Sequence, residues 1–387
     1  MNADELKRLV EQQDHRHLNT NSDSEVLLNV FAHELGKHAT NGLKPQQILD
    51  AVEALYKRCS GGYAVVAMII GYGIVAFRDP HGIRPLVLGI RETPNGVEHM
   101  VASESVALDA VGFELERDVQ PGEAVFIDKR GYLHSRQTAA RRGYTPCVFE
   151  FVYFARPDSR LYGQNVHQAR VRMGELLAEQ APVEADMVMG VPESGVPAAE
   201  GFAHRSGIPL GQGLVKNRYI GRSFIAPSQE LRARAVRMKL NPLRHNIEGK
   251  RLVVIDDSIV RGTTQRALVR MLREAGALEV HLRISSPPVM WSCFYGIDTG
   301  ERSELIAHRM TLEEIRADLD ADTLAFLDLD RLIEATGASE EGFCDACFTG
   351  HYPVEVPVSL RKHVLESNQL PVAEDVVQPE LVPGQVP

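Results

Sequence analysis

The sequence predicts two domains of different classes, an α+β domain with an antiparallel sheet followed by an α/β domain with a parallel sheet. Three observations lead to this prediction. The chain has 387 residues, more than one ordinary hydrophobic core accommodates. Its first part contains short apolar strands punctuated by Gly, Pro and Asn, which is typical of antiparallel sheets. Its second part alternates strands with helices, which is typical of a parallel sheet covered on both faces.

The first domain is predicted to span residues 1–142. Apolar residues recur with a helical period from Ser24 to Gly36, and the glycine ends the segment. The pattern then changes to short apolar runs, each bounded by turn residues. The strands expected from these runs lie at 63–70, 73–77, 86–89, 99–102 and 124–128.

The second domain is predicted to span residues 143–362. Its expected elements alternate along the chain: helices at 166–180, 195–204 and 264–275, and strands at 187–191, 252–255 and 279–284. Residues 363–387 are rich in Pro, Val, Glu and Gln without any period, so we expect a disordered tail.

The composition excludes several classes of function. A net charge of −10 argues against nucleic acid or an anionic membrane as the main partner. No apolar run approaches the roughly 18 residues of a membrane-spanning helix, and the first residues lack the apolar segment of a signal peptide. We therefore expect a cytoplasmic protein, in which the five cysteines would not form a disulfide framework.

The most informative segment is an apolar strand that ends in two acids and leads through a short loop into a helix, 252–264 (LVVIDDSIVRGTT). Ligands of open α/β sheets bind beyond the carboxyl ends of the strands. Backbone N–H groups, the glycine turn, two threonine hydroxyls and the helix dipole would form a phosphate cradle. The acids would accept hydrogen bonds from ribose hydroxyls or hold Mg²⁺. The string matches the phosphoribosyl-pyrophosphate signature of type I phosphoribosyltransferases, and the GxxxxGK spacing of a Walker loop is absent. The predicted binding residues are Asp256, Asp257, Ser258, Val260, Arg261, Gly262, Thr263 and Thr264.

Two further segments suit a diphosphate substrate. A loop bounded by Pro and Gly follows the strand at 187–191, and it would present backbone donors to pyrophosphate and a hydroxyl to Mg²⁺. Residues 216–239 carry seven Lys or Arg and one acid; this run is interpreted as a lid that closes on phosphates, the alternative being a solvated surface loop. The predicted residues of the loop and lid are Glu193, Ser194, Gly195, Lys216, Arg218, Tyr219, Arg222 and Lys239.

A lid has a chemical purpose in such a reaction. Displacement at the anomeric carbon builds oxocarbenium character while charge accumulates on the departing pyrophosphate. Mg²⁺ and fixed cations stabilise that charge, and closure keeps water from the sugar. No side chain needs to act as a nucleophile, and no catalytic base is indicated if the incoming group is ammonia.

Strings from both domains resemble the glutamine phosphoribosylpyrophosphate amidotransferase family, the amidophosphoribosyltransferases. The resemblance covers residues from about 3 to 362. It is carried by TNSDSE at 20–25, FRDPHGIRP at 77–85, ASES at 102–105, FVYFARPDS at 151–159, KNRYIGRSFI at 216–225, VRMKLN at 236–241, the loop at 256–264 and YGID at 295–298.

This resemblance implies the first committed step of de novo purine synthesis. An N-terminal-nucleophile glutaminase domain releases ammonia, and the phosphoribosyltransferase domain uses it to form 5-phosphoribosylamine. By resemblance Ser194, Asp256 and Asp257 correspond to Mg²⁺ positions, and Asp23 to the aspartate that holds the glutamine α-amino group. Members of the family are homo-oligomers inhibited by purine nucleotides, so a dimer or tetramer with such inhibitors is expected.

The sequence departs from the family at its start. The glutaminase of the family opens with a cysteine nucleophile, followed by an arginine and an Asn-Gly oxyanion element, and none of these is found here. Cys59 leads into a buried strand and is interpreted as a small core residue. We therefore expect either a truncated reading of a longer gene or an incomplete enzyme, with an inactive glutaminase half, that uses free ammonia.

The other four cysteines are candidate metal ligands. Cys344 and Cys347 form a CxxC pair, and Cys147 and Cys293 lie elsewhere in the second domain. Spacing alone leaves a Cys₄ zinc site and an iron–sulfur cluster equally open. The family resemblance favours a [4Fe–4S] cluster, which one branch of the family binds at these places.

Two rival functions share the phosphate loop. A nucleobase phosphoribosyltransferase would need a hood for its base, whereas this chain devotes its first part to a glutaminase-like region. A non-catalytic protein that senses phosphoribosyl pyrophosphate should carry a basic DNA-binding appendage, and this chain is acidic.

Overall fold

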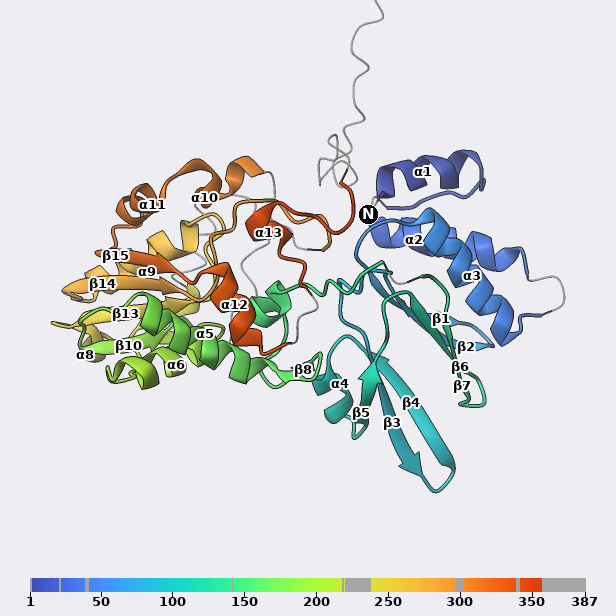
Figure 1. The fold of residues 1–387 in the computed structure, drawn as a ribbon, viewed down its shortest axis with the longest axis horizontal. Coiled ribbons are helices and arrows are strands. Elements are labelled where there is room, and N and C mark those ends of the chain that lie inside the picture. The colour runs from blue at the N-terminus through green and yellow to red at the C-terminus, as the bar shows by residue number, and fades with distance from the viewer. Residues whose placement is uncertain are drawn as a thin grey trace, which may run out of the picture.

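The structure is a computed structural model that describes residues 2–20, 22–38, 42–140, 142–217, 219, 238–296, 302–338 and 342–356. Figure 1 shows two parts side by side: the N-terminal part, in blue and teal, and the C-terminal part, in green to red. The chain passes from one to the other between the end of β7 (Leu133–Gln137) and the short π-helix η2 (Glu150–Phe154). The predicted tail at 363–387 lies outside the described residues.

The N-terminal part begins with three helices, α1 (Ala3–Gln12), α2 (Asp23–Gly36) and α3 (Pro45–Arg58). They precede an antiparallel sheet in the order β1-β2-β6-β7, whose other strands are β1 (Ala64–Ile69), β2 (Gly73–Arg78) and β6 (Glu123–Asp128). Apolar side chains of α2 and α3 pack with Val75 and Phe77 of β2 in one buried cluster. The helices therefore cover one face of this sheet.

A second, three-stranded antiparallel sheet projects from the body of the molecule (Figure 1). It has the order β4-β3-β5, with β3 (Val87–Thr93), β4 (Gly96–Ala102) and β5 (Glu114–Asp118), and α4 (Ser105–Asp109) lies against it. Glu104, at the N-terminal end of α4, binds the C-terminal part: its Oε2 accepts hydrogen bonds from Arg156 N at 2.7 Å and Ser159 Oγ at 2.8 Å.

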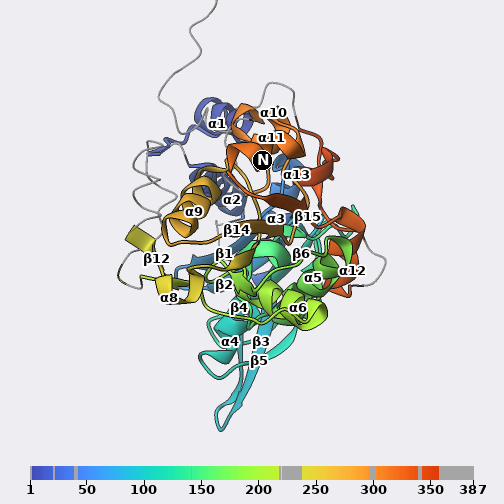
Figure 2. The ribbon, with the colours of Figure 1, turned by 90° about the vertical axis from the view of Figure 1, so that its left-hand side faces the viewer.

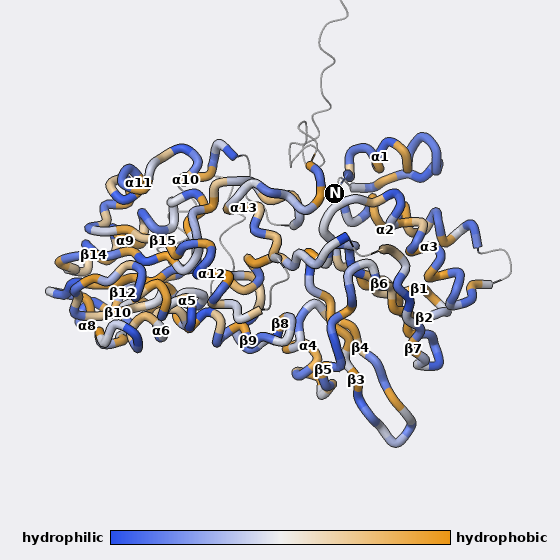
Figure 3. Tube along the Cα trace, in the orientation of Figure 1, coloured by the Kyte–Doolittle hydropathy of each residue, from blue (hydrophilic) through white to orange (hydrophobic). Residues whose placement is uncertain are grey.

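The C-terminal part is built on a parallel sheet in the order β10-β13-β14-β15, with β10 (Met187–Gly190), β13 (Arg251–Asp256), β14 (Glu279–Ile284) and β15 (Thr323–Phe326). Alternate residues of the strands enter two separate apolar clusters, one on each face. One cluster includes α5 (Val166–Gln180), α6 (Val196–Ser206) and α12 (Leu329–Thr336), and the other includes α9 (Thr263–Glu274) and α11 (Leu312–Asp318) (Figure 2). Figure 3 shows hydrophilic residues along α11, at the outer edge, where Ile315 is the buried residue of the helix.

Short elements connect this framework. They are β8 (Arg160–Leu161), β9 (Gln164–Asn165), β11 (Leu214–Lys216), β12 (Leu240–Pro242), α8 (Arg244–Ile247), η3 (Arg302–Glu304), α10 (Ile306–Arg309) and α13 (Ala346–Thr349).

The predicted classes of both parts are confirmed, since the first sheet is antiparallel and the second is parallel. The expected helix at 166–180 and the expected strand at 279–284 coincide with α5 and β14. The predictions omitted α1, α3 and α12, among others. The buried residues of α1 and α3 recur with a helical period, so these two helices were open to prediction from the sequence.

Candidate functional site

The two acids at the end of β13 form the centre of the candidate site. Asp256 and Asp257 are 5% and 6% exposed. The Asp256 carboxylate accepts hydrogen bonds from Asp257 N and from Gln265 Nε2, both at 3.0 Å. Asp257 Oδ1 accepts one from Ser258 Oγ at 2.5 Å, and the Ser194 hydroxyl also bonds this carboxylate.

Two buried carboxyls side by side resist ionisation. Burial raises the pKa of both, and for Asp256 the charge of Asp257 raises it further. Hydrogen bonds from Ser194 and Ser258 and the nearby Arg170 act in the opposite direction on Asp257. A divalent cation or the hydroxyl donors of a sugar would stabilise the ionised form of this pair.

The loop after the acids has the shape of a phosphate cradle. Gly262 adopts φ +76° and precedes the first turn of α9, which opens with Thr263 and Thr264 and has no side-chain cap. A Cβ atom on Gly262 would lie 2.6 Å from Ile306 Cδ1. Because the N–H groups of this turn have no capping side chain, they are available to an anion.

Arg261 is turned toward a neighbouring segment. Its Nε donates to Glu304 Oε2 at 2.8 Å, and its second nitrogen lies 2.6 Å from the same oxygen. Val260 O accepts a hydrogen bond from Ile306 N at 2.9 Å. In the free protein Arg261 therefore fastens the loop to the segment 302–306.

The loop between β10 and α6 lies beside these acids. Val191 N donates to Ile255 O at 2.8 Å, and a Cβ atom on Gly195 would lie 2.3 Å from that same oxygen. Glycine is therefore required for this close approach to the end of β13. Beyond it Glu193 Oε2 is exposed and pairs with Lys216 Nζ at 3.0 Å.

The structure describes the base of the predicted lid. Lys216 of β11 pairs with Leu240 of β12, and Asn217 N donates to Lys239 O at 2.6 Å. The two ends of the basic segment are thus held together next to the loop at 192–195. Tyr219 is fully exposed, whereas Arg218 and Arg222 lie outside the described residues, so their role stays a prediction.

Arg170 is a buried charge behind the acids that the sequence did not single out. It is 4% exposed and donates to Phe151 O and Ala155 O, both at 2.8 Å. Burial lowers its pKa, while Asp257 is the largest opposing influence. It therefore connects η2, at the domain junction, with the acid pair.

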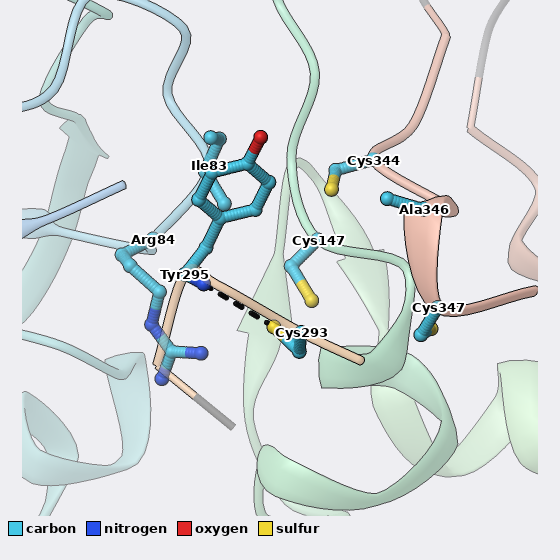
Figure 4. A pocket seen from close by; sticks show the side chains of 8 residues that line it. All are labelled: Ile83, Arg84, Cys147, Cys293, Tyr295, Cys344, Ala346 and Cys347. Atoms are coloured by element: carbon cyan, nitrogen blue, oxygen red, sulfur yellow. Dashed lines mark hydrogen bonds between the residues drawn. The ribbon is translucent and has the colours of Figure 1, made fainter. Parts of the chain in front are cut away.

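The four predicted cysteine ligands line one pocket (Figure 4). Three chain segments meet there: Cys344 N donates to Pro146 O at 2.9 Å, Val148 N donates to Cys344 O at 3.2 Å, and Met290 N donates to Cys347 O at 3.0 Å. Ile83, Arg84, Tyr295 and Ala346 complete the lining. Burial raises the pKa of Cys147 and Cys347 well above the usual thiol range.

The remaining cysteine and the predicted glutamine-site residue lie in the N-terminal part. Cys59 is buried, and burial raises the pKa of its thiol to about 12. Asp23 is the first residue of α2 and is exposed. It is followed by Glu25, which accepts hydrogen bonds from Asn19 N at 2.8 Å and Thr20 N at 2.7 Å.

Sequence reasoning missed Gln265, Glu304, Arg170 and Arg84. Gln265 lies on the first turns of α9, nine residues after Asp256, the acid that it binds. Its place could have been predicted, because it is a polar residue on the otherwise apolar face of the helix. Glu304 is 43 residues from its partner Arg261, and no local pattern could have paired them.

Among the described residues, no helix is both long and apolar enough to cross a membrane.

Comparisons with known proteins agree with this geometry. A family described as phosphoribosyl transferase domain matches residues 167–285, and one described as glutamine amidotransferase domain matches residues 1–110. The amidophosphoribosyltransferase of Pseudomonas aeruginosa is 49% identical over 361 residues, which cover 91% of this chain and 72% of that protein. That of Escherichia coli is 47% identical over 360 residues, covering 91% and 71%.

The fold agrees as well. The solved structure of a glutamine phosphoribosylpyrophosphate amidotransferase from B. subtilis, complexed with ADP and GMP, superposes with a TM-score of 0.81 at 44% sequence identity. The match covers 94% of this chain and 77% of that chain. With relatives of 47–49% identity along nearly the whole chain and a solved structure of the same fold, this protein belongs to the amidophosphoribosyltransferase family.

Proposed function

We propose that this chain forms 5-phosphoribosylamine from phosphoribosyl pyrophosphate and ammonia, as an enzyme of purine biosynthesis. The observation that carries the proposal is the buried pair Asp256–Asp257 beyond β13, flanked by two glycine-dependent loops. The pair faces the ribose, the turn at Gly262 receives the 5-phosphate, and the loop at Glu193–Gly195 receives the pyrophosphate. Lys216 and Lys239, at the base of the predicted lid, add positive charge on the pyrophosphate side.

The acid pair fits Mg²⁺. Two buried carboxylates and the Ser194 hydroxyl supply the oxygen ligands that this ion prefers. Bound there, the ion would neutralise charge on the departing pyrophosphate. The protein itself holds the sugar in place, aligns the leaving group with the cradle, and exposes the anomeric carbon to ammonia.

We infer that ammonia is the nitrogen donor for this chain as it stands. A cysteine nucleophile needs a thiol that ionises readily. Cys59 is buried with a pKa of about 12, and the other four cysteines of the five line the pocket of Figure 4. None of them is placed as a glutaminase nucleophile.

We propose that these four cysteines hold a structural [4Fe–4S] cluster. They line one pocket, and they come from three separate chain segments. Among the described residues no three His, Cys, Asp or Glu are placed to hold a metal ion, so the choice of a cluster over zinc rests on the family resemblance of the sequence. The cluster would fasten Cys147, Cys293 and the CxxC pair together.

For the regulation and the oligomeric state of this protein, our proposals come from its relatives. The related structure from B. subtilis is complexed with ADP and GMP, so we propose that purine nucleotides inhibit this enzyme. We also propose a homo-oligomer, a dimer or tetramer, in the cytoplasm, where cysteines stay reduced.

The reaction is tested by following pyrophosphate release with Mg²⁺ and phosphoribosyl pyrophosphate. We expect release with excess ammonium and only background release with glutamine. Equal rates with the two donors would refute the inference that this chain uses ammonia but not glutamine. A preference for adenine, guanine or uracil would replace the function by that of a nucleobase phosphoribosyltransferase.

Two matched variants test whether the acid pair after β13 is the binding site. Asp257→Asn should abolish most turnover. Asp186→Asn changes a carboxylate at the opposite end of β13, where Asp186 pairs with Arg251 at 2.9 Å, and it should leave turnover unchanged. Equal activity of the two variants would contradict the site.

A further inference from the structure

One cationic side chain, that of Arg84, lines the pocket together with the four cysteines. Of the described residues that line it, Ile83, Tyr295 and Ala346 are uncharged, and Arg84 is the single cation. Arg84 belongs to the N-terminal part, in the turn after β2, whereas all four cysteines belong to the C-terminal part. Figure 4 shows it at the rim of the pocket, on the side of Tyr295 and Cys293.

Arg84 has two neighbours at this place, an acid and an aromatic ring. Its side-chain nitrogen lies 3.0 Å from Glu150 Oε1, and its guanidinium lies 5.6 Å from the centre of the Phe154 ring. Glu150 is 3% exposed, and its N–H donates to Cys147 O at 3.2 Å. The ion pair therefore stands directly beside the first of the cysteines, with the cation at the pocket and the anion behind it.

The charges of this region favour a cationic Arg84. A guanidinium keeps its proton throughout the physiological pH range. A cluster bound by four thiolates is anionic as a whole, because the thiolates outweigh the charge of the iron–sulfur core. The four cysteines are buried and the Arg84 side chain is 28% exposed, so water screens the interaction between cation and anion only in part.

We propose that Arg84 is the charge partner of the cysteine-bound cluster and sets its reduction potential, with Glu150 as an opposing charge. This inference rests on the cluster proposed above. Net charge near a cluster is one of the quantities that fix its potential. Reduction adds one electron, supplied in the assay by a chemical reductant such as dithionite, and makes the cluster more negative. A neighbouring cation stabilises the reduced form, and a neighbouring anion destabilises it.

The proposal makes two predictions of opposite sign. Arg84→Met removes the cation that lines the pocket, so the potential should fall. Glu150→Gln removes the anion and leaves Arg84, so the potential should rise. We expect the ratio of reduced to oxidised cluster at a fixed potential to change at least tenfold in each case, which is 59 mV for a one-electron couple. Arg84→Lys keeps the charge and should stay near the wild type.

Arg91→Met is the matched control. Arg91 also has an ion-pair partner, Glu98 at 2.6 Å, and also lies over an aromatic ring, that of Phe113 at 4.2 Å, but it is in β3 and does not line the pocket. Its removal should leave the potential unchanged. Each anaerobically purified protein is analysed for iron and sulfide, and its potential is measured by titration with dithionite, followed by electron paramagnetic resonance.

The outcomes separate the two proposals. A wild type without iron overturns both the cluster and the role of Arg84. An iron-loaded wild type whose potential is the same in Arg84→Met, Glu150→Gln and Arg91→Met overturns the role of Arg84 alone. If Arg84→Met does not retain iron, the other two variants test the proposal. A raised potential in Glu150→Gln together with an unchanged potential in Arg84→Lys supports it. Any other pair of results refutes it.

Discussion

Replacing Gly262 by alanine should weaken phosphoribosyl-pyrophosphate binding while leaving most of the protein's stability intact. Gly262 has φ +76°, and a residue with a Cβ atom pays about 1–2 kcal/mol in that conformation. The new Cβ would also lie 2.6 Å from Ile306 Cδ1, and Ile306 is fully buried. Overpacking of this kind costs about 1–3 kcal/mol, so the cradle conformation becomes less favourable by at least about 2 kcal/mol.

We expect the free variant to relieve this strain by a shift of the loop out of the cradle conformation. Substrate binding must then restore it, and the cost appears in the KM for phosphoribosyl pyrophosphate. At about 1.4 kcal/mol for each factor of ten, we expect KM to rise at least about thirtyfold. Pyrophosphate release with saturating ammonium, measured over a range of substrate concentrations, gives this value.

Gly207→Ala is the control. Gly207 has φ +75°, follows α6, and has no atom within 4 Å of an added Cβ. It pays the same backbone cost outside the site, so its melting temperature should fall, by about 2–4 °C for each kcal/mol, while KM stays constant. If Gly262→Ala has a KM within twofold of the wild type, or if Gly207→Ala raises KM equally, the reasoning about the cradle is wrong.

Three other predictions concern the same chain. Glu304→Gln removes the charge that holds Arg261, and we expect KM for phosphoribosyl pyrophosphate to rise a few-fold with kcat nearly unchanged; a loss confined to kcat would contradict a positioning role. Removal of Mg²⁺ by a chelator should abolish pyrophosphate release, and excess Mg²⁺ should restore it, whereas turnover without a divalent ion would refute the assignment of the acid pair. Cys347→Ser should lower the iron content and the thermal stability together, as measured by iron analysis and calorimetry, and a full complement of iron in this variant would exclude Cys347 as a ligand.

The local part of the site could be predicted from the sequence because its residues are contiguous. Asp256, Asp257 and Gly262 lie within one strand–loop–helix unit, and the physical reasons for each are local: a strand end, a buried charge and a positive φ. The parallel sheet followed from the same regularity of strand and helix. These predictions needed no knowledge of tertiary contacts.

The rest could not be predicted because it depends on distant contacts. Glu304 meets Arg261, and Arg84 meets Glu150, through packing that no periodicity encodes. The helix α3 is a different case, because its signal is local: Pro45 begins it, and Ile48, Val52 and Leu55 recur with a helical period on its buried side. It was overlooked although no tertiary contact was needed to predict it.

The junction described above has a consequence for how the protein unfolds. Ile83 comes from the N-terminal part, yet it is 1% exposed within the apolar cluster of the C-terminal part, and Glu104 and Arg84 add polar contacts across the same boundary. A C-terminal fragment that begins near residue 143 would therefore lose the apolar contacts of Ile83 in its interior. The buried carboxylate of Glu150 would also lose its ion pair with Arg84. The point at which the chain changes from one fold class to the other is not a point at which it can be divided, and we expect heat to unfold both parts in a single calorimetric transition.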